Sequence, residues 1–141
     1  MILYGIPNCD TVKKARAWLG ERGVDYTFHD FKKLGVPPAR LDAWLRSAGP
    51  DRLLNRQGTT WRKLDTTDQA RSASGEGARA LMLAQPSVIK RPVVEWPDGT
   101  VSVGFDPAQW TVRRIVRWDV IGRPRISKRP ANLFPKLVLS R

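Results

Sequence analysis

The order of hydrophobic and polar positions predicts a strand, a helix and a second strand at the start of the chain. Residues 1–5 form a short apolar run typical of a buried strand. Between Val12 and Arg22, apolar side chains recur at helical spacing, and Gly23 is suited to end the helix. Residues 25–29 alternate in the manner of a strand. These segments indicate a βαβ unit, in which the two strands are parallel and joined by a right-handed crossover.

The next part of the chain has a helical period and is expected to form an insertion over about residues 36–86. Gly49-Pro50 and Gln85-Pro86 interrupt the pattern and separate its helices. Thr59 or Thr60 is the expected N-cap of a short helix in the middle of the insertion. The helices predicted around it cover residues 37–49, one further turn at 51–55, and residues 74–84.

The period then changes to that of a β-hairpin. Residues 93–96 lead into the turn sequence 97–100, which reads Pro-Asp-Gly-Thr, and apolar residues alternate beyond it at Val101, Val103 and Phe105. Asp106 is a suitable N-cap for a last helix over about residues 107–118. The complete order predicts an α/β, thioredoxin-like fold. Its four-stranded mixed sheet consists of the βαβ unit plus the hairpin, with the helical insertion between the second and third strands.

Positive charge is concentrated at the end of the chain. Of 25 Lys and Arg and 13 Asp and Glu, nine cations and one acid fall in residues 111–141, so most of the net charge of +12 lies there. We expect one domain over residues 1–118 and a basic tail over 119–141 that is disordered or loosely attached. Such a tail permits only weak, non-specific contact with nucleic acid. A native role, disorder and a cloning or frameshift extension all remain open for it.

The composition argues against several classes of protein. No apolar run reaches the roughly 20 residues that span a bilayer, and no leader-like segment precedes the first strand, so we expect a cytoplasmic protein without membrane contact. One cysteine and one histidine disfavour a structural zinc site, and no metal or bound cofactor is expected. A single cysteine also excludes an intramolecular disulfide. Redox chemistry would have to take its second thiol from another molecule.

That cysteine, Cys9, is the main catalytic candidate. It stands where the first strand gives way to the first helix, so free backbone N–H groups and the helix dipole can stabilise its thiolate. The alternative is that Cys9 has only a structural role, as a small buried hydrophobic residue. Beside it, Thr11 can donate a hydrogen bond to the sulfur or simply cap the helix, and Asn8 can contact a ligand or shape the turn.

Other conspicuous residues are interpreted as structural. His29 ends the second predicted strand and is expected at the edge of the sheet rather than as a general base for Cys9. Ala15 stands six positions after the cysteine, so the Cys-x5-Arg loop of tyrosine-phosphatase-like enzymes is absent. Three tryptophans on helix faces are expected in the core, namely Trp18, Trp44 and Trp110. The two that flank arginine segments, Trp61 and Trp96, are candidates for the lining of a cleft.

Four segments together resemble the ArsC-like reductases of bacteria, most closely the YffB group, which is related to the regulator Spx. These are residues 4–15, 53–62, 89–92 and 103–105. The resemblance implies a thioredoxin-like fold, a nucleophilic cysteine before the first helix, and arginines that contact an anionic or thiol substrate. Carried over position by position, these residues are Cys9, Arg62 and Arg91.

The same resemblance implies a cis peptide bond between Arg91 and Pro92, beside the cysteine. Backbone groups of Lys90 and Arg91 would then face a peptide-like ligand, as expected for glutathione. The predicted binding residues are Arg62, Arg91, Pro92, Asn8, Thr11 and Lys90. Two departures from the family matter. The third arginine of arsenate reductases is replaced within Gly104-Phe105-Asp106, and Cys9-Asp10-Thr11-Val12 lacks the second cysteine common in Spx-type regulators.

These observations predict a glutathione-dependent monothiol reductase that acts through a Cys9 thiolate and a mixed disulfide. Its partners would be glutathione, a small thiol or oxyanion substrate, or a protein disulfide. Two alternatives are an arsenate reductase coupled to glutathione and glutaredoxin, and a non-catalytic, Spx-like regulator that binds the transcription machinery. The physiological substrate and the oligomeric state do not follow from the sequence.

Overall fold

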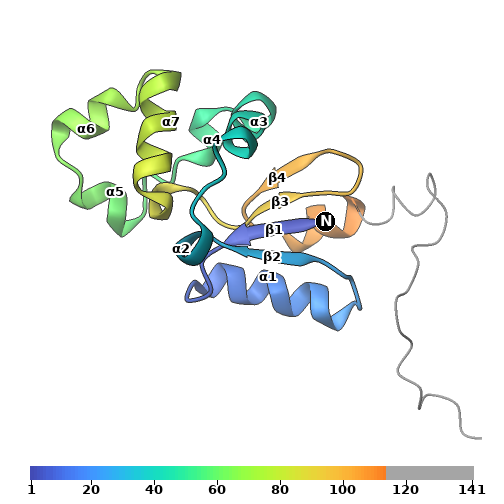
Figure 1. The fold of residues 1–141 in the computed structure, drawn as a ribbon. Helices are drawn as coiled ribbons and strands as arrows, with labels where there is room; N and C mark the ends of the chain where they lie inside the picture. The colour runs from blue at the N-terminus through green and yellow to red at the C-terminus, as the bar shows by residue number, and fades with distance from the viewer. Residues whose placement is uncertain (114–141) are drawn as a thin grey trace, which may run out of the picture.

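The computed structural model describes residues 1–113, which form a four-stranded mixed sheet in the order β2-β1-β3-β4 (Figure 1). β1 runs parallel to β2 and antiparallel to β3, and β4 is antiparallel to β3. The strands are β1 (Ile2–Gly5), β2 (Thr27–Asp30), β3 (Val93–Glu95) and β4 (Val101–Val103). The predicted fold class is therefore confirmed, with helices inserted between β2 and β3.

The helices follow the predicted order, with α2, α6 and one 3-10 turn in addition. They are α1 (Asp10–Glu21), α2 (Phe31–Leu34), α3 (Pro38–Ala48), α4 (Pro50–Leu53), α5 (Thr59–Lys63), α6 (Thr66–Arg71), α7 (Gly75–Ala84) and the 3-10 turn η1 (Pro86–Val88). A last helix occupies 107–113. None of the helices in this described part is both long and apolar enough to cross a bilayer. The predicted continuation to 118 and the basic tail lie outside the described residues.

The sequence pattern missed α2 and α6, and it placed one cap wrongly. Both missed helices are too short to show a period and start through local capping: Asp30 accepts the N–H of Lys32 at 2.8 Å, and Asp65 accepts that of Asp68 at 2.7 Å. The N-cap of α5 is Gly58, not Thr59 or Thr60, because Thr59 already has helical geometry.

Two hydrophobic clusters pack on opposite faces of the sheet, because neighbouring strand residues point to opposite sides. Leu3 belongs to the cluster under α1 and the last helix, whereas Tyr4 belongs to the cluster under the insertion. The tryptophans predicted for the core, Trp18, Trp44 and Trp110, are all buried. Trp96 is also buried, at 7% exposure, and donates its indole N–H to Ser102 Oγ at 2.8 Å, so it does not line an open cleft.

A charged network on the insertion side joins α3 to the central strand β3. Glu95 is 9% exposed, and its carboxylate accepts hydrogen bonds from Arg40 Nε at 2.8 Å and Trp44 Nε1 at 2.9 Å. Arg40 Nη2 donates to the second carboxylate oxygen, so the guanidinium binds Glu95 in a bidentate manner. Burial raises the pKa of Glu95, but the Arg40 and Trp44 donors outweigh it and hold the pKa below its usual range. Burial and the nearby Glu95 raise the pKa of Tyr4 to about 12. This network holds α3 against the sheet.

Gly77 is required where α6 turns into α7. A Cβ at this position would lie 1.8 Å from the Arg71 carbonyl oxygen, whereas a Cβ at Gly75 would meet nothing within 4 Å. Alanine normally stabilises a helix by about 0.5–1 kcal/mol relative to glycine. We therefore expect Gly75→Ala to be neutral or slightly stabilising and Gly77→Ala to lose about 1–3 kcal/mol in urea unfolding. Equal effects of the two substitutions would contradict this close approach.

Candidate active site

Cys9 occupies the N-cap of α1, at the end of the short loop that leaves β1. Its backbone is extended, with φ −133° and ψ 124°, and its carbonyl accepts the N–H of Lys13 at 2.9 Å. No side chain caps this helix, so the sulfur itself lies next to the free amides of the first turn. The thiol is half-buried, which leaves it accessible to a reaction partner.

The surroundings of the thiol favour its ionised form. Burial raises the pKa of Cys9, but the N–H of Val12, the guanidinium of Arg91 and the N–H of Thr11 together outweigh burial and bring the pKa below its usual value. Thr11 thus acts through its backbone amide, and the predicted hydroxyl contact is not what lowers the pKa. A thiolate at neutral pH is the nucleophilic form of cysteine.

Arg91 reaches Cys9 from the segment just before β3. The Arg91–Pro92 peptide bond is cis, as predicted. Arg91 Nη1 donates to the Ser87 carbonyl at 2.9 Å, which ties the guanidinium to η1. Nε is buried and has no hydrogen-bond partner among the described residues. The protein therefore fixes one nitrogen of the Arg91 guanidinium, while other N–H groups of the guanidinium remain available beside the thiol.

The segment that carries Arg91 is itself fixed to the insertion. Leu54 and Ile89 form an isolated antiparallel bridge, and the N–H of Lys90 donates to the Leu53 carbonyl at 2.7 Å. Of the backbone groups of Lys90 and Arg91 expected to face a ligand, the Lys90 N–H therefore does not, because it already donates to Leu53; the role of the others stays a prediction. The binding role of Lys90 stays a prediction that can rest only on its other groups.

The remaining predicted residues lie at different distances from this centre. Pro92 is buried and its carbonyl accepts the N–H of Gly104 at 2.9 Å, whereas Asn8 is exposed in the loop before Cys9. Arg62 is exposed on α5, a helix that packs against η1 and so lies next to the turn that holds Arg91. Within the described residues no contact joins Arg62 to Cys9. The binding roles of these three residues stay predictions.

The position of the missing third arginine is filled by structural residues. The Phe105 ring packs against Trp110, with ring centroids 4.8 Å apart, and against Trp18. Asp106 Oδ1 accepts the N–H of Ala108 at 3.0 Å and caps the last helix, as predicted. A side chain that packs in the core and one that caps a helix cannot replace an oxyanion-binding cation.

His29 is a structural residue, as interpreted from the sequence. It lies on β2, an edge strand, and its Nε2 is 2.8 Å from the Gly35 carbonyl oxygen. Its ring packs between Tyr4 and Phe31. In residues 1–113 no three His, Cys, Asp or Glu side chains lie close enough to hold a metal ion.

Ser87 is the site residue that the sequence did not reveal. It acts through its backbone carbonyl, and any residue type can offer a carbonyl, so its identity carried no signal. The Val12 amide was foreseen only as part of a helix N-terminus in general.

Comparisons with known proteins identify the family of the chain. The solved structure of the protein YffB is 47% identical, with a TM-score of 0.73, and covers 79% of this chain and 96% of that one. An arsenate reductase (ArsC) related protein from Brucella melitensis is 52% identical, with a TM-score of 0.63, over 79% of this chain and 91% of that one. The global transcriptional regulator Spx of Staphylococcus epidermidis is 23% identical over 106 residues, or 74% of this chain and 79% of that one. The model of the ArsC family matches residues 4–112, and the chain therefore belongs to the ArsC family.

Proposed function

We propose that this protein is a cytoplasmic, glutathione-dependent monothiol reductase. The observation that carries the proposal is the Cys9 thiol with a lowered pKa beside Arg91, whose guanidinium is tied to Ser87 and keeps further donors available. A single reactive cysteine beside a cation is well placed to form a mixed disulfide with an anionic thiol such as glutathione.

In the proposed reaction, the Cys9 thiolate attacks the glutathione sulfur of a substrate disulfide R–S–S–G. A new bond forms between Cys9 Sγ and that sulfur, the old S–S bond breaks, and R–S⁻ leaves and takes up a proton. The thiolate of a free glutathione then attacks the glutathione sulfur of the mixed disulfide. This step releases the Cys9 thiolate and forms glutathione disulfide. In the net exchange, R–S–S–G and one free glutathione give R–SH and glutathione disulfide, so the R sulfur is reduced and the sulfur of the free glutathione is oxidised, while its proton balances the one taken up by R–S⁻.

The surrounding residues would bind the glutathione moiety. Arg91 can pair with a carboxylate while it stabilises the thiolate, and Arg62 on the neighbouring α5 can hold a second carboxylate. Asn8 and Thr11 on the loop side, and Pro92 and Lys90 on the opposite side, complete the proposed binding residues. No bound cofactor or metal takes part in these steps.

Intact-mass measurement after treatment with oxidised glutathione tests the proposal. We expect one glutathione adduct per chain, removed by excess free glutathione, and no adduct on Cys9→Ser. The alkylation rate of the thiol should rise with pH through a midpoint below the usual cysteine pKa of about 8.5, because the thiolate is the reactive form. An absent adduct, or a midpoint at the usual value, would refute the proposal.

Arsenate reduction coupled to glutathione and glutaredoxin is the second candidate, since a relative is described as related to arsenate reductase. Phe105 and Asp106 weaken it, because they occupy the place of the third arginine. Arsenate-dependent oxidation of NADPH in a coupled assay would support this candidate. A regulatory role like that of Spx would instead predict capture of RNA polymerase that persists in Cys9→Ser.

A further inference from the structure

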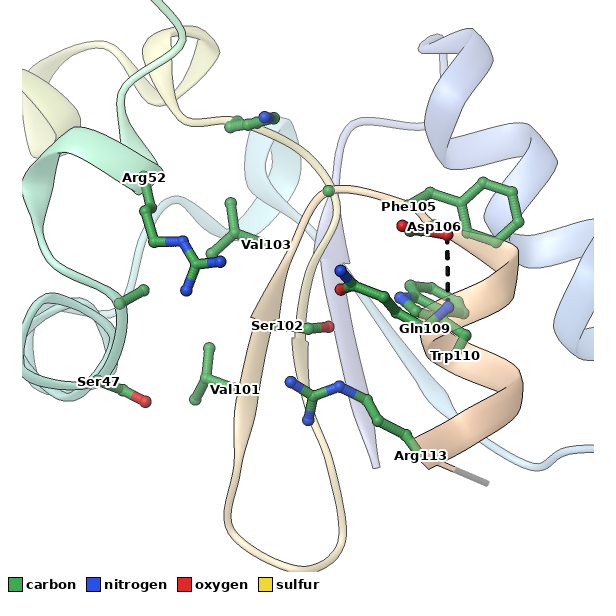
Figure 2. Close-up of a pocket in the computed structure, with 13 residues that line it drawn as sticks. Ser47, Arg52, Val101, Ser102, Val103, Phe105, Asp106, Gln109, Trp110 and Arg113 are labelled. Carbon is green, nitrogen blue, oxygen red and sulfur yellow. Dashed lines mark hydrogen bonds between the residues drawn. The ribbon is translucent and has the colours of Figure 1, made fainter. Parts of the chain in front are cut away.

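A cleft of about 290 Å³ surrounds the outer edge of β4, and Cys9 is not among the residues that line it (Figure 2). Ser47 and Ala48 of α3 and Arg52 of α4 line one side of it, and Gln109, Trp110 and Arg113 of the last helix line the other. Figure 2 shows the Arg52 and Arg113 side chains reaching toward β4 from opposite sides. The cleft thus exposes a strand edge between two walls.

The backbone at this edge is available for pairing. β4 pairs only with β3 in the described sheet. The Thr100 carbonyl accepts the N–H of Trp96 at 2.8 Å, and the N–H of Gly104 donates to the Pro92 carbonyl at 2.9 Å, so the even-numbered residues turn toward β3. Val101 and Val103 therefore point their N–H and C=O groups outward. Unpaired edge groups of this kind can accept a further strand.

The charge of the cleft selects the kind of strand. Three cations line it, namely Arg52, Lys90 and Arg113, against the single carboxylate of Asp106, which is already engaged in capping the last helix. Arg52 and Lys90 form no ion pair within the described residues. Arg113 donates to Thr100 Oγ1 at 2.9 Å, which places its guanidinium beside the hairpin. The free edge is thus surrounded by positive charge.

We propose that the outer edge of β4 docks an extended, acidic segment of a partner protein, which adds to the sheet as a fifth strand. Backbone bonds to Val101 and Val103 would set its position, and carboxylates would meet Arg52, Lys90 and Arg113. A second copy of this chain would bring the same cations against themselves. The sequence beyond Arg113 has eight cations and one acid, so it does not supply an acidic segment either. Charge complementarity therefore favours an acidic partner.

Fluorescence anisotropy with the full chain and a labelled peptide of alternating glutamate and valine tests this docking. We expect salt-sensitive binding that weakens about tenfold or more in Arg52→Glu/Lys90→Glu. The single charge reversal Lys32→Glu, on α2 and outside the cleft, should change affinity less than about twofold. Circular dichroism of each variant checks that the fold is kept. Binding does not require the thiol, so Cys9→Ser should bind equally, whatever the fate of the proposed reductase activity.

A second peptide separates strand addition from simple charge attraction. Methylation of its backbone nitrogens keeps every charge but removes the donors that pair with an edge, so we expect binding to fall about tenfold or more. Equal affinity of the methylated peptide would overturn the proposal and assign the attraction to charge alone. A peptide with lysine in place of glutamate that binds as well would also overturn it. A dimer disrupted by Arg52→Glu/Lys90→Glu would identify a second copy as the occupant and refute an acidic partner.

Discussion

Replacing Arg91 with methionine is expected to slow mixed-disulfide formation between Cys9 and oxidised glutathione by about tenfold or more. The guanidinium has two roles, because it lowers the pKa of the thiol and can bind a glutathione carboxylate. Loss of a charge-assisted hydrogen bond costs about 1.5–3 kcal/mol, which is roughly tenfold to a hundredfold in rate. Intact mass at timed intervals gives the rate.

A neutral alkylating reagent isolates the effect on the pKa. Below the pKa, each unit of increase lowers the thiolate fraction about tenfold but raises its intrinsic nucleophilicity about threefold, so the rate falls only about threefold per unit. We expect the alkylation midpoint of Arg91→Met to move to higher pH, since burial still raises the pKa and the opposing cation is lost. Arg91→Lys, which keeps the charge, should move it less.

Arg62→Met is the matched control. Arg62 makes no contact with Cys9 in the part of the chain that the structure describes, and it does not appear among the groups that shift the thiol pKa. The pH profile of alkylation of Arg62→Met should equal that of the wild type. Its rate of mixed-disulfide formation with oxidised glutathione should fall, because the proposal gives Arg62 a carboxylate of glutathione to bind. An unchanged midpoint in Arg91→Met would contradict the electrostatic role of Arg91.

Trp44→Ala is expected to lower the free energy of unfolding by about 3–5 kcal/mol. The Trp44 side chain is 0% exposed and packs against Tyr4 and Phe31, with ring centroids 4.6 and 6.2 Å away. Its indole N–H also donates to Glu95 Oε1 at 2.9 Å. Truncation leaves a cavity and removes one donor from a buried carboxylate. The free energy of unfolding of a small domain is only about 5–15 kcal/mol in total, so the variant should approach unfolding at body temperature.

Trp44→Phe separates packing from hydrogen bonding. It keeps most of the ring and loses only the donor, and Arg40 still holds Glu95, so we expect a loss of about 1–2 kcal/mol. Urea unfolding followed by circular dichroism provides both values. A similar loss in the two variants would show that the Glu95 contact, and not the packed ring, supplies most of the stability.

The fold was largely predictable because its signals lie within short windows. The strand at residues 1–5, the helix that follows and the Pro-Asp-Gly-Thr turn each depend on neighbouring residues, and the structure contains all three. α2 and α6 were missed because each is too short to show a helical period. α2 depends instead on the single contact from Asp30 to the N–H of Lys32.

The candidate site also has features that follow from neighbouring residues and features that depend on distant segments. The place of Cys9 at a helix N-cap follows from adjacent segments, and the resemblance to the ArsC family supplied the cis bond before Pro92. The bridge that occupies the Lys90 amide joins two segments far apart in sequence, so no local pattern predicted it. Trp96 was misjudged for a related reason, since its burial depends on contact with Trp110 of the last helix, which lies in the same cluster.

The amino-acid order alone determines the place of the thiol at a strand-to-helix junction, the absence of a second cysteine from the given sequence, and the order of the elements, because each is a property of neighbouring residues or of composition. Tertiary structure decided which groups surround that thiol. It brought Arg91 to Cys9, tied it through Ser87, and left the edge of β4 open between cations from α4 and the last helix. These relations depend on how the sheet and the insertion pack, and only packing brings distant residues together.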